Sequence, residues 1–135
     1  MVLLDSNVLI EHLSGRLNIT DQIRALGSSA CYVSSVSVYE ILHGSLRSAK
    51  SGEYRRVENL LARLPRLPFD DSCAAATAKI RVELEKIGMR IGLYDLMLAG
   101  TALAYDLTVI THNTREYERV GGLRIKDWQN GDLGA

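Results

Sequence analysis

The chain has 135 residues, of which 47% are hydrophobic and 24% are charged, and its 16 basic residues balance its 16 acidic residues. This length and composition predict one globular domain over residues 1–135, with roughly two-thirds of the unfolded surface buried. A neutral chain has no global field that would attract nucleic acid, so a polyanion would have to be held by a local patch or by a metal ion.

The cysteines and the hydropathy pattern predict a cytoplasmic protein. Cys31 and Cys73 lie far apart and show no CxxC spacing, which favours a reducing compartment over a disulfide framework or a zinc site. The N-terminus carries no basic leader, and no run reaches the roughly 18 consecutive apolar residues of a membrane span. We therefore expect no contact with a membrane.

The N-terminal half alternates short apolar runs with amphipathic segments. Buried strands are predicted at residues 2–5 and 30–33, because both are short apolar runs bounded by polar residues. Helices are predicted for the segments between and after them, at about residues 8–13, 19–26, 36–47 and 54–64. Ser34 or Ser35 can cap the third of these helices, and Pro65 ends the fourth.

The next segment contains a weak strand and a long helix. Residues 66–69 are predicted as an edge strand or a loop, because Pro68 removes a donor of the sheet. Asp70 or Asp71 then caps a helix that runs to about Ile87, with Ile87 as the last residue of its buried stripe.

The stretch from Ile91 to Val120 predicts a buried helix, a short strand and a polar elbow. The helix starts near Tyr94, the strand covers residues 107–111, and the elbow is the run 111–114. A last strand is predicted at residues 123–126, and the tail from about residue 129 is expected to be frayed. Because strands alternate with helices, the sequence predicts an α/β fold with a short, mostly parallel sheet of four to five strands between helices.

Three acidic residues each have an ordinary explanation when taken singly. Asp5 follows a strand and precedes a helix, so capping that helix would explain it. Asp95 lies in the first turn of a helix, where the helix dipole favours a negative charge. Glu40 shares a helix stripe with Val36 and His43, and a glutamate there should be paired with a cation or bound to a metal.

Together the acids indicate a metal site. Asp5 and the elbow at 111–114 follow predicted parallel strands, while Glu40 and Asp95 lie in helices that begin near the same edge of the sheet. Crowded carboxylates raise one another's pKa unless a cation neutralises them, and hard oxygen ligands select Mg²⁺ or Mn²⁺. The chemistry this predicts is metal-assisted attack of water on a phosphodiester.

At these residues the sequence resembles the PIN-domain ribonucleases, and more narrowly the VapC toxins of bacterial type II toxin–antitoxin pairs. The resemblance covers nearly the whole chain, and it rests on four blocks, VLLDSNVLI (2–10), VSSVSVYEILHG (33–44), IGLYDLMLAGTAL (91–103) and LTVITHNTREYERV (107–120). It implies a PIN-like three-layer α/β/α sandwich for the single domain.

The resemblance also implies roles for individual residues. Asp5, Glu40 and Asp95 match the three family acids, with Asp5 and Asp95 as the usual metal ligands and Glu40 as a further possible one. Many relatives carry a fourth acid where this chain has Asn113, which can coordinate through its oxygen but supplies no charge. Glu116 is the candidate replacement, and an ordinary acid at the start of a helix is the alternative explanation.

Other residues are expected to support this site. Hydroxyl and amide side chains that can brace the acids, although each could equally be a turn or cap residue, are Ser6, Asn7, Thr111 and Thr114. Basic residues that could contact RNA, although scattered charges are usually only solvating, include Arg47, Arg81 and Arg115. His43 and His112 fit no zinc motif and are interpreted as structural or surface residues.

The function implied by the resemblance is that of an Mg²⁺-dependent endoribonuclease toxin, homodimeric and inhibited by a small VapB-like antitoxin. It would cut tRNA or another structured RNA through metal-activated water, with Mn²⁺ as a possible substitute, and would meet DNA only through the antitoxin. A haloacid-dehalogenase-like phosphatase needs a second acid at the position of Asn7, which disfavours it. The alternative from another class is a non-catalytic PIN module that binds RNA or protein as a scaffold, in which the acids would be lost.

Overall fold

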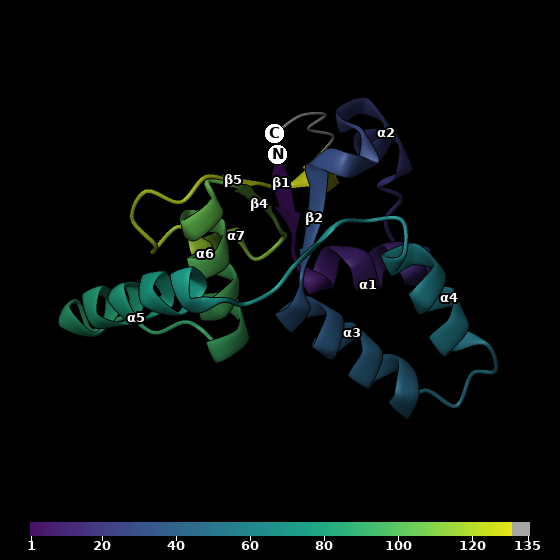
Figure 1. Ribbon diagram of the computed structural model, residues 1–135, viewed down its shortest axis with the longest axis horizontal. Coiled ribbons are helices and arrows are strands. Elements are labelled where there is room, and N and C mark those ends of the chain that lie inside the picture. The colour runs from purple at the N-terminus through teal and green to yellow at the C-terminus, as the bar shows by residue number, and fades with distance from the viewer. Residues whose placement is uncertain (131–135) are drawn as a thin grey trace.

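The computed structural model describes residues 1–130, and its centre is a five-stranded parallel sheet (Figure 1). The strands lie in the order β3-β2-β1-β4-β5. In chain order the elements are β1 (Val2–Leu4), α1 (Ser6–Ser14), α2 (Thr20–Leu26), η1 (Ser28–Ala30), β2 (Cys31–Ser34), α3 (Ser35–Arg47), α4 (Glu53–Leu61), β3 (Arg66–Leu67), α5 (Asp71–Lys86), α6 (Leu93–Tyr105), β4 (Thr108–Ile110), α7 (Thr114–Tyr117), β5 (Ile125–Lys126) and η2 (Trp128–Asn130). The predicted strands are all present, and the weak one is a two-residue edge strand.

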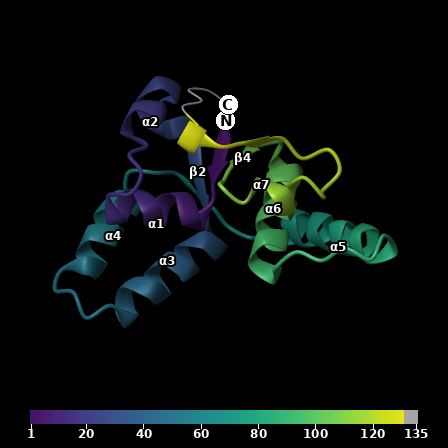
Figure 2. The ribbon, with the colours of Figure 1, turned by 180° about the vertical axis from the view of Figure 1, so that it is seen from behind.

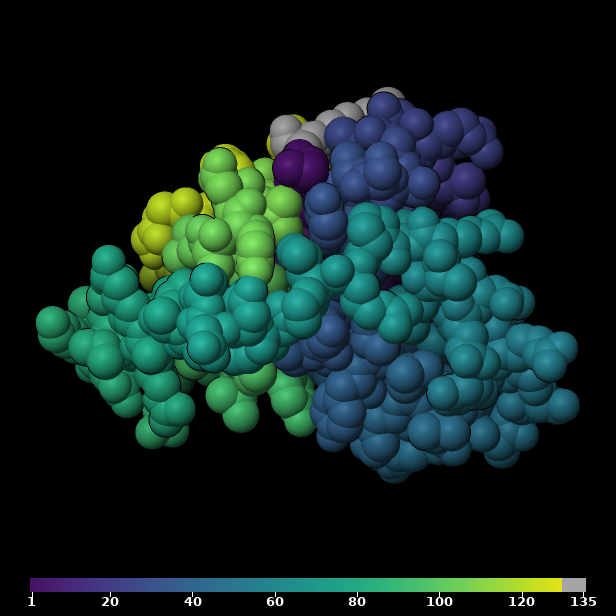
Figure 3. Space-filling view, viewed as in Figure 1, coloured from purple at the N-terminus to yellow at the C-terminus, as the bar shows by residue number. Residues whose placement is uncertain are grey.

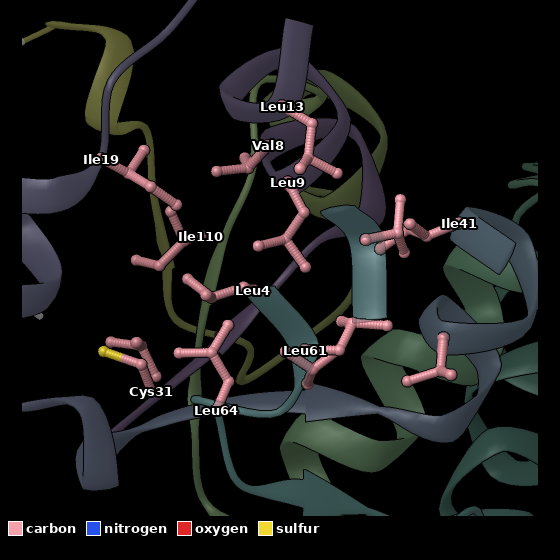
Figure 4. Close-up of a cluster of buried hydrophobic side chains, with 14 of the residues drawn as sticks. Leu4, Val8, Leu9, Leu13, Ile19, Cys31, Ile41, Leu61, Leu64 and Ile110 are labelled. Carbon is pink, nitrogen blue, oxygen red and sulfur yellow. The ribbon is translucent and has the colours of Figure 1, made fainter. Parts of the chain in front are cut away.

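The side chains of the central strand β1 alternate between two hydrophobic cores, because successive residues of a strand point to opposite faces. Val2 and Leu4 belong to the core beneath α1, α3 and α4, part of which Figure 4 shows, whereas Leu3 belongs to the core beneath α5 and α6. All three side chains are fully buried. Helices therefore cover both faces of the sheet, as the view from behind also shows (Figure 2), and the predicted three-layer α/β/α sandwich is confirmed.

Local sequence signals set the ends of several helices. The Ser34 hydroxyl accepts a hydrogen bond from the Val36 N–H at 3.1 Å and caps α3, and Asp70 caps α5 by accepting from the Cys73 N–H at 3.0 Å. Asp106 ends α6 with a left-handed backbone (φ 55°), a conformation that aspartate tolerates better than most residues. The chain then enters β4 beside β1.

Two details of the sequence prediction are wrong. Helix α4 ends at Leu61 and not at Leu64, because the turn before Pro65 tightens to bonds such as Leu64 N–H to Leu61 C=O at 3.2 Å. Ile87 does not belong to the buried stripe of α5 and is 63% exposed. It lies just past the helix end, where Gly88 (φ 68°) turns the chain away.

Helices α5 and α6 approach each other very closely at one point. A Cβ atom on Gly100 of α6 would collide with the Thr77 hydroxyl of α5 and would lie 2.9 Å from the Thr77 backbone nitrogen. The Thr77 hydroxyl is itself held on α5, where it donates to the Cys73 carbonyl at 2.7 Å. Gly100 therefore sets the position of α6, whose first turn carries Asp95.

The C-terminal end of the described region is the short helix η2, which includes Trp128 as a fully buried anchor. The frayed tail expected from about residue 129 falls largely on residues 131–135, which lie outside the described residues. Within residues 1–130, none of the helices combines the length and apolar character needed to cross a membrane.

We predict that Gly100→Ala lowers the free energy of unfolding by about 1–3 kcal/mol, because the added methyl group must push α5 and α6 apart. Gly44→Ala in α3 is the matched control, since nothing lies within 4 Å of its added Cβ. That change should leave stability equal or raise it by about 0.5–1 kcal/mol. Urea unfolding of both variants measures the difference, and equal stability of the two would contradict the close contact.

Candidate active site

The site forms where the central strands β1 and β4 end. Leu4 of β1 pairs with Ile110 of β4, so the next residues, Asp5 and Thr111, lie side by side at the carboxyl edge of the sheet. The Thr111 hydroxyl donates to Asp5 Oδ2 at 2.7 Å, and the Asp5 side chain is only 2% exposed. Asp5 occupies the N-cap position of α1, but its carboxylate makes no capping hydrogen bond of good geometry. The backbone N–H groups of Ser6 and Asn7 still lower its pKa, so Asp5 faces both the start of α1 and the polar elbow.

Ser6 connects Asp5 to the helix on one side of the site. Its hydroxyl oxygen lies 3.2 Å from Glu40 Oε1 of α3 and 3.4 Å from Asp5 Oδ1. A serine hydroxyl has one proton, so it can donate to only one of these carboxylates at a time. The half-buried Glu40 is thus held next to Asp5 by a shared donor.

Asp95 enters from the other side, in the first turn of α6. Both of its oxygens are held by the segment that follows β4. The Tyr117 hydroxyl donates to Asp95 Oδ1 at 3.2 Å, and the Asn113 side-chain amide donates to Asp95 Oδ2 at 3.1 Å. The carboxylate is therefore fixed in orientation by two neutral donors.

The acids interact electrostatically, and their pKa values show it. Burial raises the pKa of Asp5, although the hydrogen bond from Thr111 opposes this effect. Burial and, to a smaller extent, the charge of Asp5 raise the pKa of Glu40. Burial and the charge of Asp5 raise the pKa of Asp95 to about 6, with a further contribution from Glu116. Glu116 in α7 is thus near enough to act on the pKa of Asp95.

The negative charge of this cluster is not neutralised within the described chain. Among residues 1–130, no lysine, arginine or histidine forms a salt bridge with Asp5, Glu40, Asp95 or Glu116. Carboxylates that repel one another in a partly buried site favour the binding of a cation. The electrostatics of the site therefore suit a metal ion.

The geometry limits how such an ion could be held. Within residues 1–130 there is no group of three or more His, Cys, Asp or Glu side chains that could together hold a metal ion. The two acids that the family resemblance names as the usual metal ligands are Asp5 and Asp95. Two carboxylates, Asp5 and Asp95, with water in the remaining positions fit the habit of Mg²⁺, which keeps several of its waters in protein sites.

The structure brings together some of the predicted supporting residues and not others. Ser6 and Thr111 contact the acids directly, and the Thr111 hydroxyl also accepts from the Asn113 N–H at 2.9 Å. Asn113 points its amide nitrogen at Asp95, so it acts here as a donor. Asn7 is exposed, and Thr114 begins α7.

The basic residues that were expected to contact RNA are all exposed but lie on different elements. Arg47 ends α3 and Arg115 lies in α7 beside Glu116. Arg81 lies on α5, where it pairs with Glu85 at 3.7 Å. These positions do not form one basic patch.

Tyr117 is a site residue that the sequence prediction missed. Its side chain is fully buried, and burial together with the charges of Asp5, Asp95 and Glu40 raises its pKa, so it stays a neutral donor. The available signal was its place one residue after Glu116, in the helix that follows the polar elbow.

His112 is half-buried between two further acids, Glu11 and Asp127. Its Nδ1 lies 2.7 Å from Asp127 Oδ1, and its Nε2 lies 2.9 Å from Glu11 Oε2, a contact that falls short of hydrogen-bond geometry. The imidazole thereby connects the elbow to α1 and to the chain after β5. The ring nitrogens of His112 therefore face Glu11 and Asp127.

Known proteins share both the sequence and the fold of this chain. The PIN domain family model matches residues 2–123. The tRNA(fMet)-specific endonuclease VapC of Salmonella typhimurium is 37% identical, and that of Shigella flexneri 35%, each over 93% of this chain and 96% of the relative. The crystal structure of DNA-bound VapBC from Salmonella typhimurium has a TM-score of 0.87 at 35% identity and covers 95% of this chain and 99% of that one.

These matches extend over nearly all of the chain and over nearly all of the relatives. The matched residues 2–123 include all four sequence blocks. The protein therefore belongs to the PIN-domain family and, within it, to the VapC ribonucleases.

Proposed function

We propose that this ribonuclease is an Mg²⁺-dependent endonuclease that cuts a tRNA and is inhibited by a small antitoxin protein. The observation that carries the proposal is the cluster of Asp5, Glu40, Asp95 and Glu116, whose charges no cation of the described chain neutralises. PIN-domain ribonucleases are metal-dependent. Mg²⁺ is the proposed ion because the site offers carboxylate oxygens in place of thiolate or imidazole ligands.

In this proposal the residues of the chain hold the acids in place and accept a proton. Asp5 and Asp95 would hold the ion, and the donors Thr111, Asn113 and Tyr117 keep their oxygens oriented. When bound, Mg²⁺ would lower the pKa of water and offset the charge of the phosphodiester. Glu40 would accept the proton that the attacking water loses, because burial and the charge of Asp5 move its pKa upward, toward the range that suits a general base.

The proposed substrate and partner rest on the relatives. Two relatives at 37% and 35% identity are named tRNA(fMet)-specific endonucleases, which supports initiator tRNA as the substrate of this chain. The similar Salmonella structure is a DNA-bound VapBC complex, which supports a VapB-like antitoxin that carries the contact with DNA. The scaffold alternative would require an inert site, and the retained acids argue against it.

We predict that the protein, purified free of antitoxin, cleaves initiator tRNA only in the presence of Mg²⁺ or Mn²⁺ and leaves a 5′-phosphate. The reason is that the hydrolytic reaction uses water and not the ribose 2′-hydroxyl. Gel analysis of end-labelled tRNA, with and without EDTA, checks both points. Cleavage that persists in excess EDTA, or a 2′,3′-cyclic phosphate product, would rule out this chemistry.

We predict that Asp5→Asn, Glu40→Gln and Asp95→Asn each lower the rate of cleavage by at least about 100-fold while the protein stays folded. In metal-free buffer Asp95→Asn should also stabilise the protein. The pKa of Asp95 is about 6 in the folded state and 3.8 ordinarily, so between these pH values the folded state binds more protons than the unfolded state does. The free energy of unfolding therefore falls as pH rises from 3.8 to about 6.

The stability gain expected for Asp95→Asn above pH 6 is on the order of 1 kcal/mol, after allowance for solvent screening of this half-buried group. Urea unfolding at acid and neutral pH measures it, and circular dichroism confirms folding. Glu83→Gln, a change of an exposed acid on α5, is the matched control. It should alter neither the rate of cleavage nor the free energy of unfolding. Loss of folded structure in all three acid variants would instead indicate that these residues are structural.

We predict opposite effects on Mg²⁺ binding for changes at two residues near Asp95, Glu116 and Asn113. Glu116→Gln should weaken Mg²⁺ binding and lower the rate of cleavage if this acid supplies the missing fourth charge. Asn113→Asp should tighten Mg²⁺ binding, but should destabilise the metal-free protein, because it puts a second charge where an amide now donates to Asp95 at 3.1 Å.

The measurement is the Mg²⁺ concentration that gives half-maximal cleavage, determined for both variants and for Glu118→Gln. Glu118 is an exposed acid just beyond α7 and provides the control for a simple loss of surface charge. Unchanged kinetics in Glu116→Gln would remove Glu116 from the site and leave it as a helix acid worth less than about 1 kcal/mol of stability.

A further inference from the structure

Exposed aromatic side chains stand directly beside two of the acids. Tyr39 precedes Glu40 on α3 and is 54% exposed, and Tyr94 precedes Asp95 on α6 and is 41% exposed. Helices α3 and α6 pack against each other, and in Figure 3 both reach the lower rim of the molecule, α3 in blue and α6 in green. Two aromatic rings thus flank the acid cluster on the solvent side.

The rings form an ordered group with His43. Tyr39 and His43 lie one helical turn apart on α3, with their ring centroids 6.0 Å apart and their planes only 5° from parallel. Tyr94 meets Tyr39 edge-on, at 5.8 Å and 61°. The three side chains therefore fix one another's orientation without being buried in a core.

The face of α3 that carries these rings is not the face that builds the fold. Val38, Ile41 and Ser45 form the buried side of the helix, whereas Tyr39 and His43 lie on the opposite side. Arg47 continues the exposed stripe one turn beyond His43. A row of ring faces followed by a guanidinium group suits a ligand with flat bases and a negatively charged backbone.

We propose that Tyr39, His43 and Tyr94 form a stacking platform for an unpaired nucleobase next to the cleaved phosphate of the RNA, with Arg47 contacting the backbone beyond it. This inference rests on the proposed ribonuclease function and specifies how the substrate is held. Aromatic faces bind splayed bases of single-stranded RNA, whereas the edges of bases inside an RNA helix are out of their reach. The platform therefore selects a single-stranded loop or end of the substrate.

The observations favour RNA over a protein partner. Tyr39 and Tyr94 each precede one of the acids in the chain, and their rings meet at 5.8 Å between α3 and α6, where the charge of Glu40 also acts on Tyr94. A base on the platform would therefore belong to the nucleotide whose phosphate reaches the acids. The stripe also ends in a cation, which complements phosphate. A protein contact on the same face, for example through the exposed Leu46, is the outcome that the test must separate.

The test compares Tyr39→Leu with Tyr39→Phe and with Tyr54→Leu. Leucine keeps apolar bulk but has no ring face, phenylalanine keeps the ring, and Tyr54 is an exposed tyrosine on α4 that serves as the control. Steady-state cleavage of initiator tRNA gives KM and kcat. A hairpin RNA with 2-aminopurine beside the mapped cleavage position reports base stacking as a loss of fluorescence on an inactive Asp5→Asn background.

We expect Tyr39→Leu to raise KM roughly tenfold or more with a much smaller change in kcat, and to abolish the fluorescence loss. Tyr39→Phe and Tyr54→Leu should behave like the unaltered protein. Unchanged KM and fluorescence in Tyr39→Leu would overturn the platform, as would an equal defect in Tyr39→Phe, which would assign the effect to the hydroxyl.

Two further outcomes have distinct meanings. A change in oligomeric state by sedimentation in Tyr39→Leu, with KM unaltered, would make the face a protein contact and overturn the proposal. Failure of the unaltered protein to cleave any RNA would overturn the ribonuclease function itself, and the platform with it. Cleavage by the unaltered protein with an unaffected Tyr39→Leu variant overturns the platform alone.

Discussion

The pairing of β1 with β4 is the constraint on which the site depends. Because Leu4 lies opposite Ile110, the two central strands end at the same level, and Asp5 is buried with Thr111 as its donor. A shift of one residue in this register would turn Asp5 to the other face of the sheet, since side chains alternate along a strand. The buried apolar residues on both faces of β1 hold the register, so the hydrophobic cores also determine the geometry of the acids.

The same arrangement makes the site unfavourable for the folded chain on its own. Asp5, Glu40 and Asp95 all have raised pKa values, with burial as the largest cause in each, and so each ionised carboxylate opposes folding at neutral pH. Neutral donors from Ser6, Thr111, Asn113 and Tyr117 reduce this opposition without removing the charge. A cation that binds these carboxylates would offset their repulsion and raise the free energy of unfolding. The same ion would thus stabilise the fold and serve the reaction.

The acids come from elements that different contacts hold in place. Helix α3 is fixed by its Ser34 cap and its buried face, whereas α6 is fixed by the close approach of Gly100 to Thr77 on α5. The elbow after β4 is held by His112 between Glu11 and Asp127. Tyr39 and Tyr94 take part in none of these contacts and are exposed.

The sequence by itself determined the architecture and the identity of the main acids. The alternation of apolar runs with amphipathic segments predicted the strands and helices, because burial on both faces of a parallel sheet requires continuous apolar residues. The four family blocks pointed to Asp5, Glu40, Asp95 and Glu116 as candidates. The end of α4 and the exposure of Ile87 were mispredicted, because both depend on how the chain turns after the helix, which periodicity does not encode.

Only the tertiary structure decided which of these residues meet and how. The donation of the Asn113 amide to Asp95, the place of Tyr117 beneath the same carboxylate and the shared Ser6 hydroxyl all join segments far apart in the chain. The absence, within residues 1–130, of three acids placed to hold one ion likewise follows from distances between helices and strands. Spacing along a sequence sets which face of an element a side chain occupies, but the packing of elements against one another sets the distances on which coordination and proton transfer depend.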